Sequence, residues 1–284
     1  MTFSPNLYAD LQQMLHYEFM RNAFEAGTII SVIAGITGYF VVLRRSAFVA
    51  HAFSEIGFAG AAGAVLLGIP PITGLLLGST LGALAIAALG RRAANRDTQI
   101  GIVLAFALGL GLLFISLYAG YASEAYSILF GEILGISSSA VLLTLIASAG
   151  ILIAVGALYR PLLFASLDED VAEAKGLPML FLGTAFLVVV AVAVSFAVQI
   201  TGVLLIFSLM VTPAATAQYL SRRPSTAIAI SIGIALMATW VGLFVAFYTI
   251  YPVSFFITAI AFGLYLLVRG ARLVIRPRKV NGQP

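Results

Sequence analysis

Long apolar runs follow one another along almost the whole chain, and this succession constrains the fold more than any other feature. Of the 284 residues, 62% are hydrophobic and only 9% are charged, whereas a soluble domain has about 25% charged residues. A helix needs about 20 apolar residues to cross a bilayer. The runs between polar or Gly/Pro breaks number about eight or nine. The sequence therefore predicts an all-α, polytopic helical membrane protein.

The expected spans and their flanks follow from where these runs begin and end. Residues 1–22 are polar and are expected to lie along the extracytoplasmic surface. They lack the basic and apolar regions of a cleavable signal peptide, so the first span is expected to act as its own insertion signal. The transmembrane domain covers residues 23–270, and 271–284 form a basic cytoplasmic tail. The spans are expected at 23–43, 48–67, 72–89, 99–117, 140–158, 179–198, 202–219, 227–248 and from 252 to about 269.

The basic residues indicate the orientation. If Arg44 and Arg45 lie in the cytoplasm and the nine spans alternate, every lysine and arginine except Arg21 falls on the cytoplasmic side, as the positive-inside rule requires. This predicts the N-terminus outside and the C-terminus inside. The run at 124–136 is too short to span, so it is expected to be re-entrant or interfacial.

Several function classes lack their motifs. The chain has no cysteine, which excludes disulfides and thiolate metal ligands. It has no phosphate-binding loop for ATP and no H-E-x-x-H zinc motif. The formal net charge of +4 comes from basic residues at helix ends, so nucleic acid is not an expected partner. An enzyme is not expected.

The span at 48–67 contains His51 and Glu55, which are four residues apart and so share one face of a helix. A carboxylate inside a membrane costs about 2.5–3.5 kcal/mol, and such residues often line a pathway. An imidazole with a carboxylate suits zinc, manganese or iron(II). Two ligands are too few for tight binding, but two copies at a two-fold axis would supply four. Alternatively, Glu55 is a structural residue held by Ser54 or by a hydroxyl on another helix.

Small residues in the same span predict a helix-packing face, with Gly57, Gly60 and Gly63 allowing a second helix to approach closely. Pro213 lies within the span at 202–219, where it should kink or break the helix. Glu132 is a second acidic residue in or near the membrane. It could attract cations at an outer mouth of the pathway, or cap its own short segment.

The longest charged loop, 164–178, is acidic and cytoplasmic in this topology. Ser166 and Glu169 fit a capping box, and Gly176 with Pro178 fits a helix stop, so a short exposed helix is expected. The loop is either an ordinary solvated surface or a docking helix for a cytosolic partner that supplies energy. The docking reading assigns this contact to Ser166, Leu167, Asp168, Glu169, Asp170, Glu173 and Gly176.

From Tyr17 to Leu267 the chain resembles the ABC-3 family, the permease subunits of ABC importers for zinc, manganese and iron. The resemblance is carried, in order, by YEFMRNAFEAG, VVLRRSAFVAHAFSEIGFAG, YSILFGEILGIS, SLDEDVAEAKGLP and TGVLLIFSLMVTPAATAQYL. It implies an ABC importer permease bundle in the cytoplasmic (inner) membrane of a prokaryote. The implied partners are a second permease copy or a paralogue, two cytosolic ATP-binding subunits and an extracytoplasmic metal-binding protein. The transported metal and the ATP on the partner are the implied ligands, with no cofactor bound in this chain. In relatives, the loop that matches 164–178 contains the coupling helix.

The chain departs from the family in the span at 48–67. Relatives typically read G-D-A-x-S-H-A there, with Asp and His as proposed metal ligands, whereas this chain has the imidazole of His51 and the carboxylate of Glu55 in swapped order. The family's F-G-D is matched by Phe130-Gly131-Glu132. A divalent-metal importer is the first hypothesis. The alternatives are the same architecture with another cargo, such as a metal chelate, and a gradient-driven carrier that uses Glu55 as a proton relay.

Overall fold

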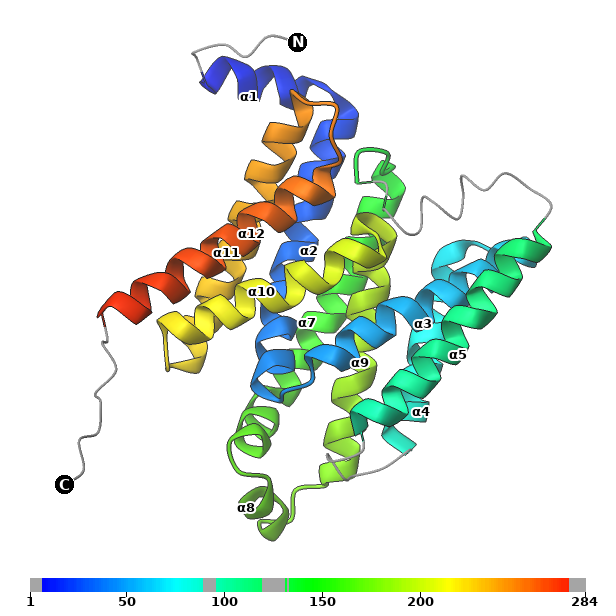
Figure 1. The fold of residues 1–284 in the computed structure, drawn as a ribbon, viewed down its shortest axis with the longest axis vertical. Coiled ribbons are helices and arrows are strands. Elements are labelled where there is room, and N and C mark those ends of the chain that lie inside the picture. The colour runs from blue at the N-terminus through cyan, green and yellow to red at the C-terminus, as the bar shows by residue number, and fades with distance from the viewer. Residues whose placement is uncertain (1–6, 89–95, 119–130, 132, 276–284) are drawn as a thin grey trace.

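The computed structural model describes residues 7–88, 96–118, 131 and 133–275, and every regular element within these ranges is an α-helix (Figure 1). The helices are α1 (Leu7–His16), α2 (Glu18–Leu43), α3 (Ala47–Leu66), α4 (Pro71–Ala88), α5 (Arg96–Leu117), α7 (Ser138–Leu167), α8 (Glu169–Ala174), α9 (Met179–Thr201), α10 (Val203–Leu220), α11 (Pro224–Phe247) and α12 (Val253–Ile275).

Nine of the helices in these ranges are long and apolar enough to cross a membrane, all except the short α1 and α8. The backbone N–H and C=O groups of such a span need no partners outside it, because an α-helix forms its backbone hydrogen bonds within itself. The all-α, polytopic fold expected from the apolar runs is confirmed.

The helices form a bundle with α2, α7 and α9 between two outer groups (Figure 1). One group is α3, α4 and α5, in which α3 packs mainly on α4 and α5. The other is α10, α11 and α12, which pack on one another, while α10 and α11 also pack on α2. The most deeply buried spans are α2, α3 and α9, whereas α5, α7 and α12 leave most of their apolar surface uncovered. An uncovered apolar helix face suits contact with lipid.

Two helix ends differ from the sequence-based expectation because burial outweighs the local break signal. The helix α7 was expected to end at Leu158 but continues through Pro161 to Leu167. Leu162 and Ala165 are buried beyond the proline, and this packing offsets the backbone hydrogen bond that Pro161 removes. Similarly, α9 was expected to break at 199–201 but runs to Thr201, and the chain turns at Gly202, whose φ is 79°. This left-handed conformation favours glycine.

Two further boundaries also shift, and one expected break is missing. The first span begins at Glu18 rather than Ala23, so part of the expected surface segment belongs to α2. At the other end, α12 runs to Ile275 and includes the first residues of the expected tail. The helix α10 passes through Pro213 without a break. Helical structure therefore extends further at these places than turn and proline signals indicate.

Candidate functional site

His51 and Glu55 lie on a stripe of α3 that the rest of the chain leaves partly uncovered. Phe48, His51 and Glu55 are half-buried or exposed, whereas the residues between them, such as Ala52 and Phe53, are buried. Residues three and four positions apart share one helix face. The two polar side chains and Phe48 therefore form one strip along the first two turns of α3.

The His51 ring is held by an aromatic neighbour from a distant part of the chain. Its centroid lies 5.3 Å from the Phe207 ring of α10 in an edge-on arrangement, and 6.3 Å from Phe48. The buried Nδ1 atom of His51 has no hydrogen-bond partner within the described ranges. Buried polar atoms usually have one. This nitrogen is therefore available as a ligand atom.

The Glu55 carboxylate forms no hydrogen bond or ion pair with any residue that the structure describes. Its carboxylate lies within electrostatic range of the His51 imidazole. The structural alternative named Ser54 as a partner, but the Ser54 hydroxyl donates to the carbonyl of His51 at 2.7 Å. An unpartnered carboxylate on a membrane helix is costly, and among the described side chains only the nearby His51 imidazole counteracts that cost.

A single copy of the chain supplies too few ligands for a closed metal site. Among the described residues, no group of three or more His, Asp or Glu side chains comes close enough to hold an ion. Glu132, the third expected ligand, lies outside the described residues. His51 and Glu55 thus provide one nitrogen and one carboxylate, whereas closed zinc sites have four ligands.

The opposite face of α3 is fixed by close helix packing. A side chain at Gly60 would overlap the carbonyl of Gly74 in α4, and one at Gly57 would overlap the Ser79 hydroxyl. Ser79 also donates a hydrogen bond to the carbonyl of Phe53 at 2.9 Å. Gly63 faces α5, where an added Cβ would lie 3.1 Å from the Phe114 ring. With α4 and α5 behind it, α3 presents His51 and Glu55 away from this packing face.

The acidic loop forms the short helix α8, but its N-cap differs from the expected capping box. The cap is Asp168, whose carboxylate accepts a hydrogen bond from the Val171 N–H at 3.0 Å. Ser166 belongs to α7, where its hydroxyl donates to the carbonyl of Leu162. The capping-box prediction was therefore wrong, because α7 continues past Ser166 and Asp168 starts the next helix. Gly176 follows α8 with a φ of 81°, which suits a helix stop.

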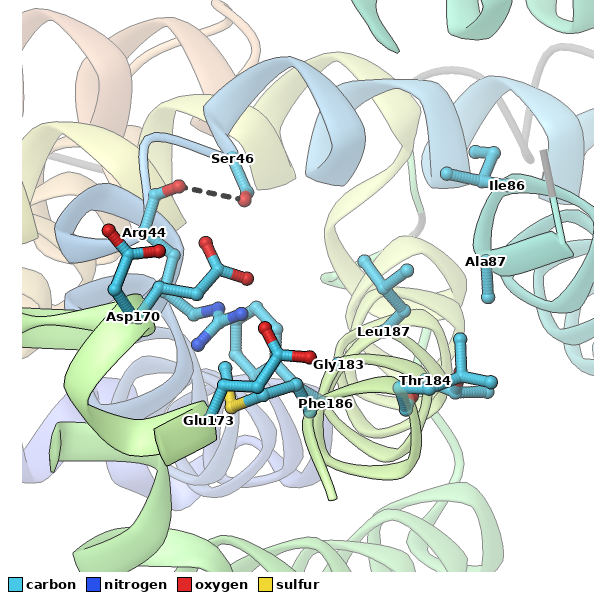
Figure 2. Close-up of a pocket in the computed structure, with 13 residues that line it drawn as sticks. Arg44, Ser46, Ile86, Ala87, Asp170, Glu173, Gly183, Thr184, Phe186 and Leu187 are labelled. Atoms are coloured by element: carbon cyan, nitrogen blue, oxygen red, sulfur yellow. Dashed lines mark hydrogen bonds between the residues drawn. The ribbon is translucent and has the colours of Figure 1, made fainter. Parts of the chain in front are cut away.

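A pocket of about 270 Å³ lies between α8 and the helix bundle (Figure 2). Its lining combines the carboxylates of α8 with Arg44 and Ser46 from the connection between α2 and α3. The remainder of its wall comes from the end of α4 and the start of α9. The pocket thus adjoins both the acidic helix and the beginning of the helix that bears His51.

Sequence reasoning missed three residues that shape these regions. Phe207 comes from a distant helix and gives no local sequence signal, so only the folded structure brings it beside His51. Arg44 was used only as a topology marker, although its position just before α3 was a signal for a role at that corner. The three-residue spacing between Phe48 and His51 could have placed Phe48 on the same face of the helix as His51.

Comparison with known proteins identifies the family. The family model described as "ABC 3 transport family" matches residues 16–270. The chain belongs to the ABC-3 family. The resemblance proposed from the five sequence motifs is thereby confirmed, and this ABC-3 chain is a multi-pass membrane permease subunit rather than an enzyme.

The relatives of this ABC-3 permease include the manganese transport system membrane protein MntC of Halalkalibacterium halodurans. It is 27% identical over 250 residues, which cover 88% of this chain and 85% of the relative. The manganese import system permease protein ScaB of Streptococcus gordonii is 28% identical over 238 residues, or 84% of this chain and 85% of the relative.

Solved structures share the fold. PsaBC from Streptococcus pneumoniae, in complex with Fab, superposes with a TM-score of 0.84 at 26% identity, covering 96% of this chain and 98% of that chain. An ABC transporter in an inward-facing conformation gives a TM-score of 0.76 at 15% identity, covering 95% of this chain and 92% of that chain. The second likeness concerns the fold alone.

Proposed function

We propose that this ABC-3 permease is the membrane subunit of an ATP-driven importer whose cargo is the manganese(II) ion, moved by alternating access past His51 and Glu55. The observation that carries the proposal is the polar pair on the uncovered stripe of α3. His51 offers a buried nitrogen and Glu55 a carboxylate, and neither has a side-chain hydrogen-bond partner in the described part of the chain. Intramembrane ionisable groups of this kind line pathways for ions.

Manganese is favoured by the relatives and fits the donor set. Two of the similar proteins are named as manganese transport or import proteins. Carboxylate oxygens suit manganese, and imidazole binds most divalent transition metals. Zinc and iron(II) fit the same two ligand types, so the choice among the three metals rests on the relatives and is decided by experiment.

A second copy of the chain, or a paralogue, completes the site. Beside His51 and Glu55, the surface of α3 and α10 is apolar, with Phe48 at 40% exposure, Phe207 at 38% and Leu204 at 60%. A partner that packs on this surface across a two-fold axis would add its own histidine and carboxylate. Four nitrogen and oxygen ligands would then hold the ion. Such a site still releases its ion when the two subunits separate, which a transport path requires.

In this proposal, partner subunits supply the energy of ATP hydrolysis and deliver the metal ion. Of the two cytosolic ATP-binding subunits, one docks on α8 of this chain, whose exposed face is acidic, and the other docks on the partner permease. An extracytoplasmic metal-binding protein delivers the ion to the opposite side. The N-terminus lies outside and the C-terminus inside, since this orientation puts every lysine and arginine except Arg21 on the cytoplasmic side.

Total cell metal, measured by mass spectrometry, tests the proposal. Cells with and without this chain are grown under limitation for manganese, zinc or iron, with the native partner subunits present. A selective fall in manganese is expected without the chain. A fall in zinc or iron instead would reassign the cargo, and no change in any metal would contradict metal import. Uptake that persists when the ATP-binding subunit cannot hydrolyse ATP would favour a gradient-driven carrier.

A further inference from the structure

The connection between α2 and α3 is a short corner closed by backbone hydrogen bonds. Arg44 is the C-cap of α2, and its backbone N–H donates to the carbonyl of Phe40 at 2.9 Å. The Ser46 N–H donates to the carbonyl of Val41 at 2.8 Å. The Ser46 hydroxyl also donates to the carbonyl of Arg44 at 3.2 Å. The next residue, Ala47, already begins α3. The connection therefore has little conformational freedom, so a displacement of the Arg44 backbone also moves the start of α3.

The side chain of Arg44 leaves this corner and contacts two other helices. Its Nη1 donates to the Ser166 hydroxyl near the end of α7 at 3.3 Å. Its guanidinium carbon lies 5.4 Å from the centre of the Phe186 ring in α9, a cation–π distance. Arg44 is thus half-buried among α7, α9 and the pocket rather than extended into solvent.

In the pocket, Arg44 meets the carboxylates of α8. Glu169, Asp170 and Glu173 line it together with Arg44. Figure 2 shows Asp170 and Glu173 on the same side of the pocket as the Arg44 side chain, which points toward Glu173. Opposite charges attract across such a partly enclosed space. By contrast, α8 itself buries a single residue, Ala172, against the bundle. Packing alone therefore ties α8 only weakly to the bundle, and the charges around Arg44 add a link to α3.

We propose that Arg44 is a positioning residue that transmits displacement of α8 to α3 and so to the His51–Glu55 pair. The inference rests on the proposed function, in which one of the ATP-binding subunits docks on α8. From the start of α3 to His51 is about 6 Å along a rigid helix, at 1.5 Å per residue. A shift of α8 that pulls the guanidinium of Arg44 would tilt the base of α3. The polar pair would then follow without any contact between it and the ATP-binding subunits.

The test measures the movement of α3 in the assembled transporter without adding metal. The chain has no cysteine, so spin labels can be placed at Leu67→Cys and Ile250→Cys after removal of any partner cysteines. Leu67 caps α3 and is 74% exposed, and Ile250, in the connection after α11, is 96% exposed. We expect the distance between the labels to change on ATP binding. Arg44→Gln should reduce this change to less than about half while the ATP-binding subunits still co-purify.

The neighbouring Arg45→Gln is the matched control, because it removes the same charge from an exposed residue that does not line the pocket. It should leave the distance change intact, and Arg44→Lys or Ser166→Ala should reduce it partly. The inference is overturned if the label distance in the unsubstituted chain does not change on ATP binding. It is also overturned if Arg44→Gln keeps the full distance change or no longer binds the ATP-binding subunits. A reduction by Arg45→Gln as large as that by Arg44→Gln would overturn it as well. Absence of metal uptake with an intact distance change would overturn only the proposed function.

Discussion

The imidazole of His51 meets the ring of Phe207 edge-on, with 5.3 Å between the ring centres. The contact joins α3 to α10, two helices from opposite groups of the bundle. Aromatic pairs in this arrangement contribute about 0.5–1.5 kcal/mol beyond their buried area. Phe207 therefore restricts the orientation of the His51 ring, and with it the direction in which the ring nitrogens point.

Removing this contact should weaken metal capture more than the maximal transport rate. Phe207→Ala leaves His51 free to rotate, so part of the binding energy is spent on ordering it. A loss of about 1 kcal/mol corresponds to a roughly fivefold higher manganese concentration for half-maximal uptake. Initial rates of manganese uptake at several concentrations measure this, with Leu220→Ala as the exposed control near the other end of the same helix. An unchanged half-saturating concentration would argue against a positioning role for Phe207.

The contact between α3 and α4 should tolerate no side chain at Gly60. A Cβ there would overlap the Gly74 carbonyl. Because this carbonyl belongs to the backbone of α4, it cannot rotate away as a flexible side chain can. We expect Gly60→Val to destabilise the bundle by about 1–3 kcal/mol, seen as a lower midpoint of thermal unfolding in detergent. The control is Gly150→Ala in α7, where a Cβ would meet nothing within 4 Å. It should leave the midpoint unchanged or raise it, since alanine favours a helix. Equal midpoints for both variants would contradict the packing argument.

The cap of α8 gives a prediction that separates the observed N-cap from the expected capping box. Asp168→Ala removes the acceptor for the Val171 N–H and should cost α8 about 0.5–2 kcal/mol. Asp168→Asn keeps an effective cap, and Ser166→Ala leaves the cap untouched. Hydrogen exchange of the α8 amides is expected to become faster in Asp168→Ala than in the other two variants. Faster exchange in Ser166→Ala instead would favour the capping box.

The sequence was sufficient for the membrane spans because each depends on a local property, a run of about 20 apolar residues. Helix ends were less predictable. Pro161 and the 199–201 segment carry local break signals, but burial of Leu162, Ala165 and Thr201 keeps the helices going. Local signals compete with tertiary packing at helix ends, and here packing prevailed.

The candidate site was predictable in its composition but not in its surroundings. The four-residue spacing of His51 and Glu55 placed them on one face of a helix, and the glycines indicated a packing face in the same helix, whose position relative to the polar pair only the structure gives. Neither Phe207 nor the contact of Arg44 with Ser166 and Phe186 follows from spacing, because these partners lie more than a hundred residues away in the chain. Long-range contacts of this kind depend on the whole bundle.

The central claim, that Glu55 is a ligand on the transport path, is tested most directly by manganese uptake through the assembled transporter carrying Glu55→Gln. The substitution keeps the size of the side chain and removes its charge. The matched control is Glu25→Gln, which removes an exposed carboxylate from α2. We expect uptake by Glu55→Gln to fall by roughly tenfold or more, as for loss of a metal-site residue. Expression and binding of the ATP-binding subunits should stay normal, and Glu25→Gln should transport normally. Uptake by Glu55→Gln at the rate of the unsubstituted chain would contradict the account.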